Sequence, residues 1–401
     1  MKSFQIMTNL GKILNKKEKY IVGLISGTSM DGVDAVLIKL KGCAEKTSFK
    51  QIGFITYPYP PGLKERIIEI ISNKKVSLDE ISRINFLIGE IFGEAALKVC
   101  QKSGVAISEI DLIGSHGQTI WHSPVKEEMF GHKIGATLQL GDPSTIAVKT
   151  GIPTVGDFRT ADVSSGGEGA PLIPYFDYLM FRDKSENRAI LNIGGISNVT
   201  LLPKNCKKKD VIGFDCGPGN LLIDQIAKLL FQKDFDKNGN IAIKGKLSVE
   251  LLNFMKEHPF LMKKPPKSSG REEFGNNYIK KILKFSEKLK KEDIIKTITE
   301  FTAFAIYLNF QRFIKDRLKV DRLIISGGGA KNKLVMNSIK KYFKETKIES
   351  TERYGIFPDA KEAIAFAVYA NETISGNPIS IKNVTGANRE NILGKICLIS
   401  F

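Results

Sequence analysis

The chain has 401 residues, of which 42% are hydrophobic and 26% charged, with a formal net charge of +17. This length and apolar content allow a substantial core and favour two or more domains, and no apolar run approaches the roughly 20 residues that a membrane helix needs. The five cysteines form no C-x-x-C pair and the four histidines no H-E-x-x-H pair, which argues against a disulfide framework or a zinc site. We therefore expect a cytoplasmic protein without a membrane partner, and we read residues 1–19 as a basic extension.

The high positive charge could indicate nucleic-acid binding. Many lysines, however, lie in amphipathic segments such as 280–296 or in short loop runs such as 207–209, and aromatic residues are not interleaved with them in a groove-like pattern. We therefore favour a solvated basic surface and expect no nucleic-acid partner. A further interpretation is a field that attracts anionic substrates.

Residues 21–40 form two strand-like apolar runs around a turn of small and polar residues. The pattern predicts a β-hairpin whose glycines let backbone N–H groups approach an anion. Thr28 and Ser29 add hydroxyl donors, and Asp31 can hold a cation directly or through water. The mixture favours a loop that binds phosphate with a metal over an ordinary tight hairpin.

Residues 50–57 predict a third strand, and residues 63–72 and 78–101 predict helices with an apolar stripe that faces the core. A short strand at 111–114 runs into small polar residues and a histidine. In α/β folds ligands bind beyond the carboxyl ends of strands, although a capped turn explains this pattern equally well.

Another strand, at 152–155, leads into a glycine-rich segment, 156–169, that mixes acids with Arg159. Long loops in a compact enzyme are often binding loops. The planar guanidinium of Arg159 suits bidentate contact with a carboxylate or a sugar.

The pattern of the opening hairpin returns at 189–202, where Gly194 and Gly195 separate two strand-like runs. A strand at 211–214 then ends at Asp215, before a glycine-rich turn and a helix at 221–232. Asp215 is either the N-cap of that helix or, as we favour, a catalytic carboxylate.

Near the end of the chain, a strand at 320–325 enters three glycines and then a helix. Glycines at a helix N-terminus let a nucleotide approach the backbone, but this signal is weak by itself. A later helix, 358–371, carries Glu362 near its start.

Together these strings resemble one family. The chain lacks the G-x-x-x-x-G-K-[ST] loop, and its paired hairpins resemble the two phosphate motifs of the actin, heat-shock chaperone and sugar kinase superfamily. More narrowly, residues 20–371 resemble the anhydro-N-acetylmuramic acid kinase family. The strings that carry this resemblance are GTSMDGVD, GSHGQTIWH, LQLGDPS, DFRTAD, GGEGAPL, LNIGGISN, GFDCGPGN and SGGGAKN.

The resemblance implies an α/β fold of two ribonuclease H-like (actin-like ATPase) domains with an ATP cleft between them. We place the first domain at residues 1–155 with about 372–401, and the second at 156–371. The family also implies a homodimer.

The implied activity is phosphorylation of 1,6-anhydro-N-acetylmuramic acid by ATP, with Mg²⁺, while water opens the anhydro ring in cell-wall recycling. By the same resemblance Asp215 is the general base and Asp31 the metal ligand. The implied ATP-binding residues are Gly27, Thr28, Ser29, Met30, Asp31, Gly32, Val33, Asp34, Gly194, Gly195, Gly327, Gly328, Gly329 and Asn332. The implied substrate-binding residues are Arg159, Glu362, His116, Gly117 and Gln118.

Two alternatives keep the same hairpins. One is a kinase for a different sugar, which would differ in the loop at 157–172. The other is an actin-like or chaperone-like ATPase without sugar kinase activity, which the absence of an evident peptide-binding domain disfavours.

Overall fold

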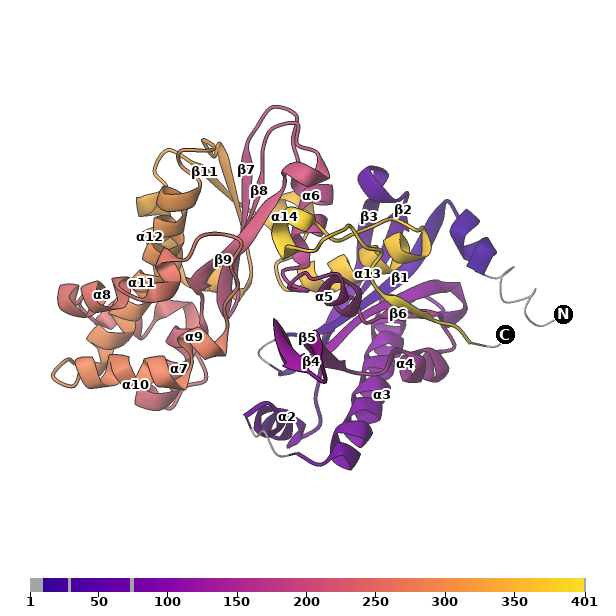
Figure 1. Ribbon diagram of the computed structural model, residues 1–401, viewed down its shortest axis with the longest axis horizontal. Coiled ribbons are helices and arrows are strands. Elements are labelled where there is room, and N and C mark those ends of the chain that lie inside the picture. The colour runs from indigo at the N-terminus through magenta and orange to yellow at the C-terminus, as the bar shows by residue number, and fades with distance from the viewer. Residues whose placement is uncertain (1–9, 28–29, 73–75, 400–401) are drawn as a thin grey trace. The chain divides into compact units, whose positions relative to one another are not determined.

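The structure is a computed structural model that describes residues 10–27, 30–72 and 76–399. The chain divides into two compact units, each with its own hydrophobic core (Figure 1). The first unit comprises residues 1–179 and 355–401, and the second comprises residues 180–354. These boundaries differ from the expected ones, which lay between residues 155 and 156 and between about 371 and 372.

The first unit is built on a sheet whose strand order is β12-β6-β4-β1-β2-β3, with β5 paired to β4. The central strand β1 runs antiparallel to β2 and parallel to β4, while β3 is antiparallel to β2 and β6 is parallel to β4. The strands are β1 (Glu18–Ser26), β2 (Gly32–Lys41), β3 (Ser48–Pro58), β4 (Ile110–Met129), β5 (His132–Leu140), β6 (Thr154–Gly156) and β12 (Lys395–Cys397).

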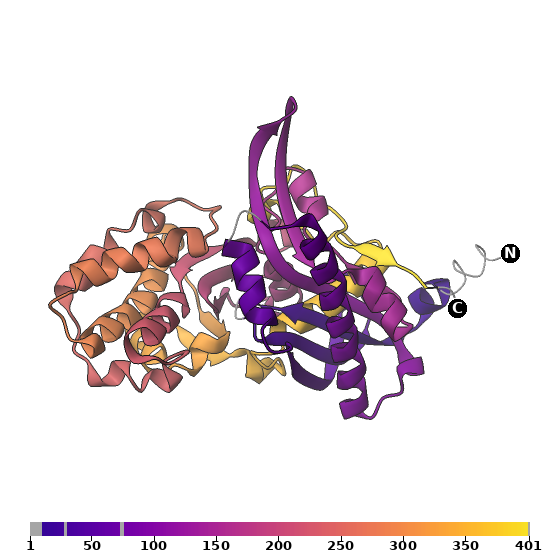
Figure 2. The same ribbon diagram turned by 90° about the horizontal axis from the view of Figure 1, so that it is seen from below.

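Strand β4 is much longer than the short strand expected at 111–114. Its second half pairs with β5 as an antiparallel arm that extends beyond the sheet, as Figure 2 shows. Several apolar side chains of the arm are exposed, including Val125 and Phe130. The alternation of burial is therefore weak there, which explains why the sequence pattern did not reveal the arm.

Helices cover both faces of this sheet. Val22 and Leu24 of β1 pack into the same cluster as the apolar stripe of α3, whereas Gly23 between them faces α13. Because side chains alternate along a strand, α3 and α13 lie on opposite faces. The helices of the unit are α2 (Leu63–Ser72), α3 (Leu78–Ser103), α4 (Pro143–Thr150), α5 (Thr160–Ser164), α6 (Ile173–Phe181), α13 (Lys361–Ile374) and α14 (Lys382–Thr385).

Two glycines bring α13 close to the sheet. A Cβ on Gly23 would lie 1.9 Å from the backbone oxygen of Ala363, and one on Gly114 would lie 2.0 Å from that of Phe366. No side chain fits at either position, so α13 contacts β1 and β4 through backbone. This packing places the helix predicted at 358–371 in the first unit instead of the second.

The second unit repeats the topology of the first. Its sheet has the order β11-β10-β7-β8-β9, with β7 antiparallel to β8, β8 antiparallel to β9, and β10 parallel to both β7 and β11. The same order and directions hold for β6-β4-β1-β2-β3, so the β7–β8 hairpin corresponds to the β1–β2 hairpin. The strands are β7 (Arg188–Ile193), β8 (Ile196–Leu202), β9 (Ile212–Pro218), β10 (Arg322–Ser326) and β11 (Lys347–Ser350). This duplication confirms the expected α/β fold of two similarly built domains.

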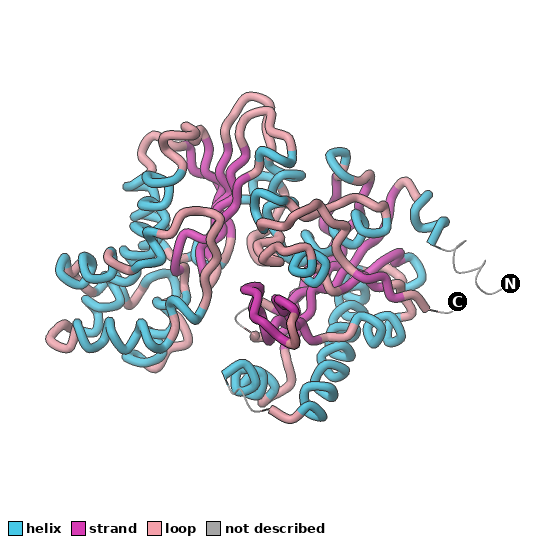
Figure 3. Tube along the Cα trace, in the orientation of Figure 1, coloured by secondary structure: helices cyan, strands magenta, loops and turns pink. Residues whose placement is uncertain are grey.

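Figure 3 shows that the chain between β9 and β10 consists of helices and loops, and these helices supply much of the second core. They include α7 (Leu221–Phe231), α8 (Val249–Lys256), α9 (Arg271–Phe274), α10 (Asn276–Phe285) and α11 (Lys291–Phe313), and α12 (Lys333–Tyr342) follows β10. None of the helices in the described part of the chain combines the length and apolarity of a membrane span.

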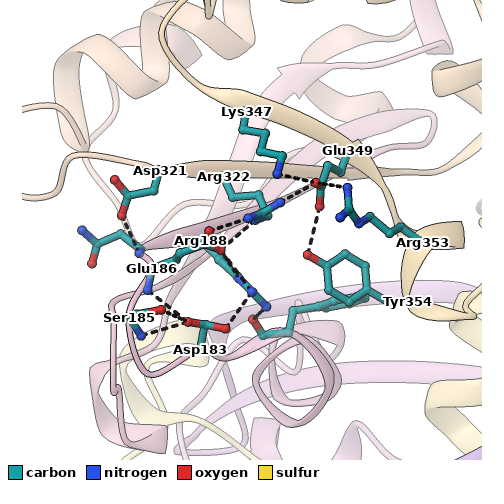
Figure 4. A network of polar contacts seen from close by, with 12 residues as sticks. Asp183, Ser185, Glu186, Arg188, Asp321, Arg322, Lys347, Glu349, Arg353 and Tyr354 are labelled. Carbon is teal, nitrogen blue, oxygen red and sulfur yellow. Dashed lines mark hydrogen bonds and ion pairs between the residues drawn. The ribbon is translucent and has the colours of Figure 1, made fainter.

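A network of ion pairs joins the first and last strands of the second unit (Figure 4). Arg322 on β10 binds Glu186 and the buried Glu349 on β11, and Arg188 on β7 binds Glu186 as well. The hydroxyl of Tyr354 donates to Glu349 over 3.2 Å. The ring of Tyr354 also meets that of Phe181 edge to face, with centroids 5.3 Å apart. The points where the chain enters and leaves the second unit are therefore adjacent.

Candidate active site

The turn of the first hairpin carries several of the predicted ATP contacts, although Thr28 and Ser29 lie outside the described residues. The N–H of Met30 donates to the carbonyl of Gly27 over 3.2 Å, which closes the turn. The Met30 side chain is buried, and its φ of 54° lies in the left-handed region. A Cβ on Gly27 would meet no atom within 4 Å, so the space beside this glycine is open.

The next residues of the hairpin differ in what they can offer a ligand. Val33 belongs to the core, and a Cβ on Gly32 would lie 2.2 Å from the Tyr57 oxygen, so neither presents a side chain. The Asp31 carboxylate is 62% exposed and forms an ion pair with Lys64 on α2. Asp31 can therefore reach a solvent-borne ion.

Asp34 lies on β2 in a more enclosed position. Thr56 donates a hydrogen bond of 2.6 Å to its carboxylate. The pKa of Asp34 is raised to about 6, chiefly by burial and also by the negative charges of Glu362, Asp359 and Asp31, while the Thr56 hydrogen bond opposes the change. A cation in this region would relieve the repulsion among these carboxylates.

Among the described residues there is no cluster of three or more acidic, histidine or cysteine side chains that could enclose a metal ion by itself. Mg²⁺ usually takes one or two carboxylates and completes its shell with water and substrate phosphates. The donor set around Asp31 and Asp34 fits a magnesium ion held in that way.

His116 lies in the buried first half of β4 and is engaged through both ring nitrogens. Its Nδ1 lies 3.0 Å from the carbonyl of Gly117, and its Nε2 accepts a hydrogen bond of 2.9 Å from Nε of Arg159. Burial first, and then the charge of Arg159, hold the pKa of His116 well below its ordinary value. A neutral imidazole in this tautomer orients Arg159.

Arg159 is held at a second point, because its Nη1 donates to the carbonyl of Gly169 over 2.7 Å. Burial lowers its pKa to about 10, while the charges of Glu362 and Asp162 oppose that change. Burial also raises the pKa of Glu362, against the nearby charges of Lys361 and Arg159. The structure thus brings together three predicted substrate residues, His116, Arg159 and Glu362, from three separate parts of the sequence.

The other two predicted substrate residues follow His116 within β4. Gly117 has a φ of +75°, and a Cβ there would lie 2.5 Å from the oxygen of Leu140. The Gln118 side chain is 2% exposed, and its Nε2 donates to the carbonyl of Thr119 over 3.2 Å. In this structure Gly117 lets β4 approach β5 closely, and the Gln118 side chain is buried.

A cavity of about 520 Å³ adjoins this region within the first unit. It lies beside the first half of β4 and beyond the carboxyl end of β6, and its lining includes Ser115, His116, Asp157 and Thr160. The hydroxyl oxygen of Ser115 is buried and has no hydrogen-bond partner in the described structure. Ligands of open α/β sheets bind at such strand ends.

The second hairpin packs its turn against the start of α7. The carbonyl of Gly194 accepts the N–H of Asn220, and the carbonyl of Gly195 accepts the N–H groups of Gly219 and Leu221, over 2.8–3.0 Å. In a trans peptide the N–H points opposite to the C=O. The amides of Gly195 and Ile196 therefore face away from α7, as an anion cradle requires.

Asp215 lies on β9 of the second unit and is 9% exposed. Its N–H donates to the carbonyl of Lys267 over 3.1 Å, and its carboxylate Oδ2 accepts the N–H of Ser269 over 2.8 Å. From the sequence alone, no role was assigned to the segment 267–269. The available signal was its run of small polar residues directly before a helix.

The late glycine segment begins directly after β10. A Cβ on Gly327 would lie 2.6 Å from the oxygen of Ile193, and one on Gly329 would lie 2.3 Å from the Ile193 side chain. These two glycines let the segment pack on the end of β7. Gly328 is open, since the nearest atom to its Cβ would be 3.8 Å away on Asn220.

Asn332 was predicted to contact ATP, but its side chain caps α12. Its Oδ1 accepts the N–H groups of Leu334 and Val335 over 3.0 and 3.3 Å, and the residue is 6% exposed. An N-cap of this kind stabilises a helix by about 1 kcal/mol. The observed contacts of Asn332 are therefore structural.

The duplicated sheets, their paired hairpins and the glycine segment after β10 define an α/β protein built like the actin-like ATPases and sugar kinases. A family model described as anhydro-N-acetylmuramic acid kinase matches residues 19–398. A protein of that name from Caldanaerobacter subterraneus subsp. tengcongensis is 44% identical over 98% of this chain and 100% of its own length. Another from Clostridioides difficile is 43% identical over 94% of this chain and 98% of its own. The chain therefore belongs to the anhydro-N-acetylmuramic acid kinase family.

Solved structures with lower similarity include the activator of 2-hydroxyisocaproyl-CoA dehydratase from Clostridium difficile. It is 14% identical, with a TM-score of 0.42, over 89% of this chain and 96% of that chain. A ROK hexokinase from Thermus thermophilus is 12% identical, with a TM-score of 0.38, over 89% of this chain and 100% of that chain.

Proposed function

We propose that this chain is an ATP-dependent kinase for 1,6-anhydro-N-acetylmuramic acid in peptidoglycan recycling. Water opens the anhydro ring during the transfer, and the products are N-acetylmuramic acid 6-phosphate and ADP. The observation that carries this proposal is the match with relatives of that name, at 41–44% identity, over nearly the whole chain. The accessible turns of the two hairpins and the held carboxylate of Asp215 support it.

In the proposed reaction Asp215 is the general base. Its carboxylate takes a proton from water as the water oxygen bonds to the anomeric carbon, and the bond from that carbon to the position-6 oxygen breaks. The freed oxygen then captures the γ-phosphoryl group of ATP. The Ser269 amide supports this role because it holds one carboxylate oxygen at a fixed orientation.

The proposed nucleotide site draws on backbone groups. The turn at Gly27 and the amides beyond Gly194 and Gly195 bind the phosphates, and the segment 327–329 lies by the adenosine. Asp31 and Asp34 would hold Mg²⁺, which neutralises phosphate charge when bound. We propose that Gly32, Val33 and Met30 determine the conformation of the first hairpin.

The acceptor sugar is bound in this proposal by Arg159 and Glu362. The guanidinium of Arg159 has two of its nitrogens fixed by His116 and Gly169, so it offers a rigid donor for a carboxylate. Gly117 and Gln118 keep this part of β4 in the conformation that presents His116.

The family resemblance further supports a cytoplasmic homodimer. Light scattering coupled to size exclusion measures the mass in solution, and the proposal requires about twice the 44.5 kDa of one chain. A single-chain mass at micromolar concentration would contradict the dimer.

The experiment that tests the activity is a coupled ADP-release assay with anhydro-N-acetylmuramic acid, followed by mass measurement of the product. A product that gains both a phosphate group and one water is expected. Gain of phosphate alone would indicate an ordinary kinase, and ADP release without any sugar would indicate the ATPase alternative. A panel of other amino sugars, including ring-opened N-acetylmuramic acid, tests the alternative of a different substrate.

A further inference from the structure

Lys267 is a buried lysine that no assigned role explains. The residue is 6% exposed and lies between the 3-10 helix Pro259–Met262 and α9. Its ammonium nitrogen lies 4.6 Å from the ring centroid of Phe260, 4.9 Å from that of Phe313 and 6.0 Å from that of Phe214. It also donates to the carbonyl of Phe260 over 3.3 Å. The rings of Phe260, Phe313 and Phe214, which we call the aromatic box, and one carbonyl therefore hold the charge in place.

The backbone beside this side chain holds Asp215 at two points. The carbonyl of Lys267 accepts the Asp215 N–H, and the N–H of Ser269 donates to the Asp215 carboxylate. Both contacts join β9 to a segment more than 50 positions further along the sequence. The orientation of the carboxylate thus depends on where residues 267–269 are anchored.

We propose that Lys267 is a positioning residue for the general base, because its ammonium group in the aromatic box anchors the segment that orients the Asp215 carboxylate. This inference rests on the proposed role of Asp215 as the base. Lys267 acts through Ser269 and its own carbonyl and takes no proton in the reaction. Phe214, which precedes Asp215 on β9, links the box directly to the base.

The charge of the anchor is itself sensitive to pH. Burial lowers the pKa of Lys267 to about 8; the charges of Cys216 and Asp215 on β9 oppose that change, and those of Arg312 on α11 and Lys263 add to it. The ammonium group is therefore mostly present at pH 7 and is lost as the pH rises through about 8. Loss of the charge removes the cation–π attraction and loosens the segment.

The first test needs no substrate. Hydrogen–deuterium exchange at neutral pH is compared over residues 267–274 in the full chain, for wild type, Lys267→Met and Lys267→Arg. We expect Lys267→Met to speed exchange roughly tenfold, because the segment opens locally, and Lys267→Arg to keep it near wild type. The control is Lys264→Met, the same substitution at an exposed lysine of the same loop.

The second test is the pH–rate profile with anhydro-N-acetylmuramic acid. We expect Lys267→Met to lower kcat about tenfold or more, since a displaced base loses alignment, with the KM for ATP little changed. Lys267→Arg restores most of the rate and moves the alkaline fall of kcat to higher pH, because arginine keeps its charge. Lys264→Met leaves both quantities unchanged.

Wild-type exchange and wild-type kcat in Lys267→Met would overturn the inference. If that variant does not fold, Lys267→Arg decides the question. A kcat that falls at the same alkaline pH in Lys267→Arg as in wild type would contradict a role for the lysine charge. Failure of the proposed function can be distinguished from failure of this inference, because wild-type protein would then release no ADP in response to the sugar. The exchange comparison would still test the anchoring of the segment.

Discussion

Asp215 and Asp34 are carboxylates in different environments, and each gives a prediction at the scale of one residue. Replacing Asp215 with Asn keeps the shape and removes the proposed base. We expect kcat to fall by about 10²- to 10⁴-fold, while titration calorimetry shows ATP binding retained. Asp316→Asn, at an exposed aspartate of the same unit, is the matched control. Near wild-type turnover in Asp215→Asn would remove Asp215 from the mechanism.

Asp34→Asn should make the protein more stable and less active. The pKa of Asp34 is raised from 3.8 to about 6, chiefly by burial, so folding favours its protonated form. That contribution to stability is present below pH 3.8 and is lost as the pH rises through about 6. The neutral amide should therefore raise the free energy of unfolding by about 1 kcal/mol at pH 7.5 and by little at pH 4.

Denaturant unfolding of Asp34→Asn and wild type at the two pH values measures this difference. Lower stability of the variant at pH 7.5 would contradict it. Reduced kinase activity in the same variant would support a metal-binding role, because functional sites commonly sacrifice stability.

At the scale of elements, the contact between β1 and α13 permits no side chain at Gly23. We expect Gly23→Ala to destabilise the protein by about 1–3 kcal/mol, because its methyl group meets the Ala363 oxygen and forces the helix away. Thermal unfolding of Gly23→Ala beside Gly11→Ala measures this effect. A Cβ on Gly11 meets no atom of the described residues within 4 Å, and alanine is the better helix former, so that control should melt no lower than wild type.

The network of Figure 4 gives a second element-scale prediction, for Glu349. Its carboxylate is 6% exposed and pairs with Arg322, Arg353 and Lys347. Glu349→Gln should cost about 1.5–3 kcal/mol, the range for hydrogen bonds to charged groups. Arg83→Ala, which breaks an exposed pair with Asp79, should cost at most about 0.5 kcal/mol in the same urea titration. Equal costs for the two variants would mean that the network adds nothing beyond surface pairing.

At the scale of the whole molecule, the second unit is an insertion into the first. Its own core and the meeting of Phe181 with Tyr354 at its two ends predict that residues 180–354 fold alone. The excised fragment should show a single cooperative unfolding transition by circular dichroism. A broad, non-cooperative transition would show that it needs the first unit.

The sequence predicted the hairpins and the strands that flank them, because those depend on local patterns of apolar residues and glycine, whereas the two-domain fold was implied by the family resemblance. It did not predict the boundaries between the units, because α13 joins β1 and β4 through backbone contacts that leave only two glycines as a trace. The sequence also did not reveal the hydrogen bonds between residues 267–269 and Asp215, because these bonds join distant parts of the chain through backbone atoms. The capping role of Asn332 was also not predicted, because an N-cap and a ligand contact use the same residue type.

The insertion also sets an order of events during synthesis. The strands β1 to β6 leave the ribosome well before α13, so one face of their sheet lacks its covering helix while residues 180–354 are being made. At about 5–20 residues per second, this interval lasts about 10–40 s. The second unit is complete before the first can close. The nascent first unit is therefore the part of the chain most exposed to aggregation and most dependent on chaperones.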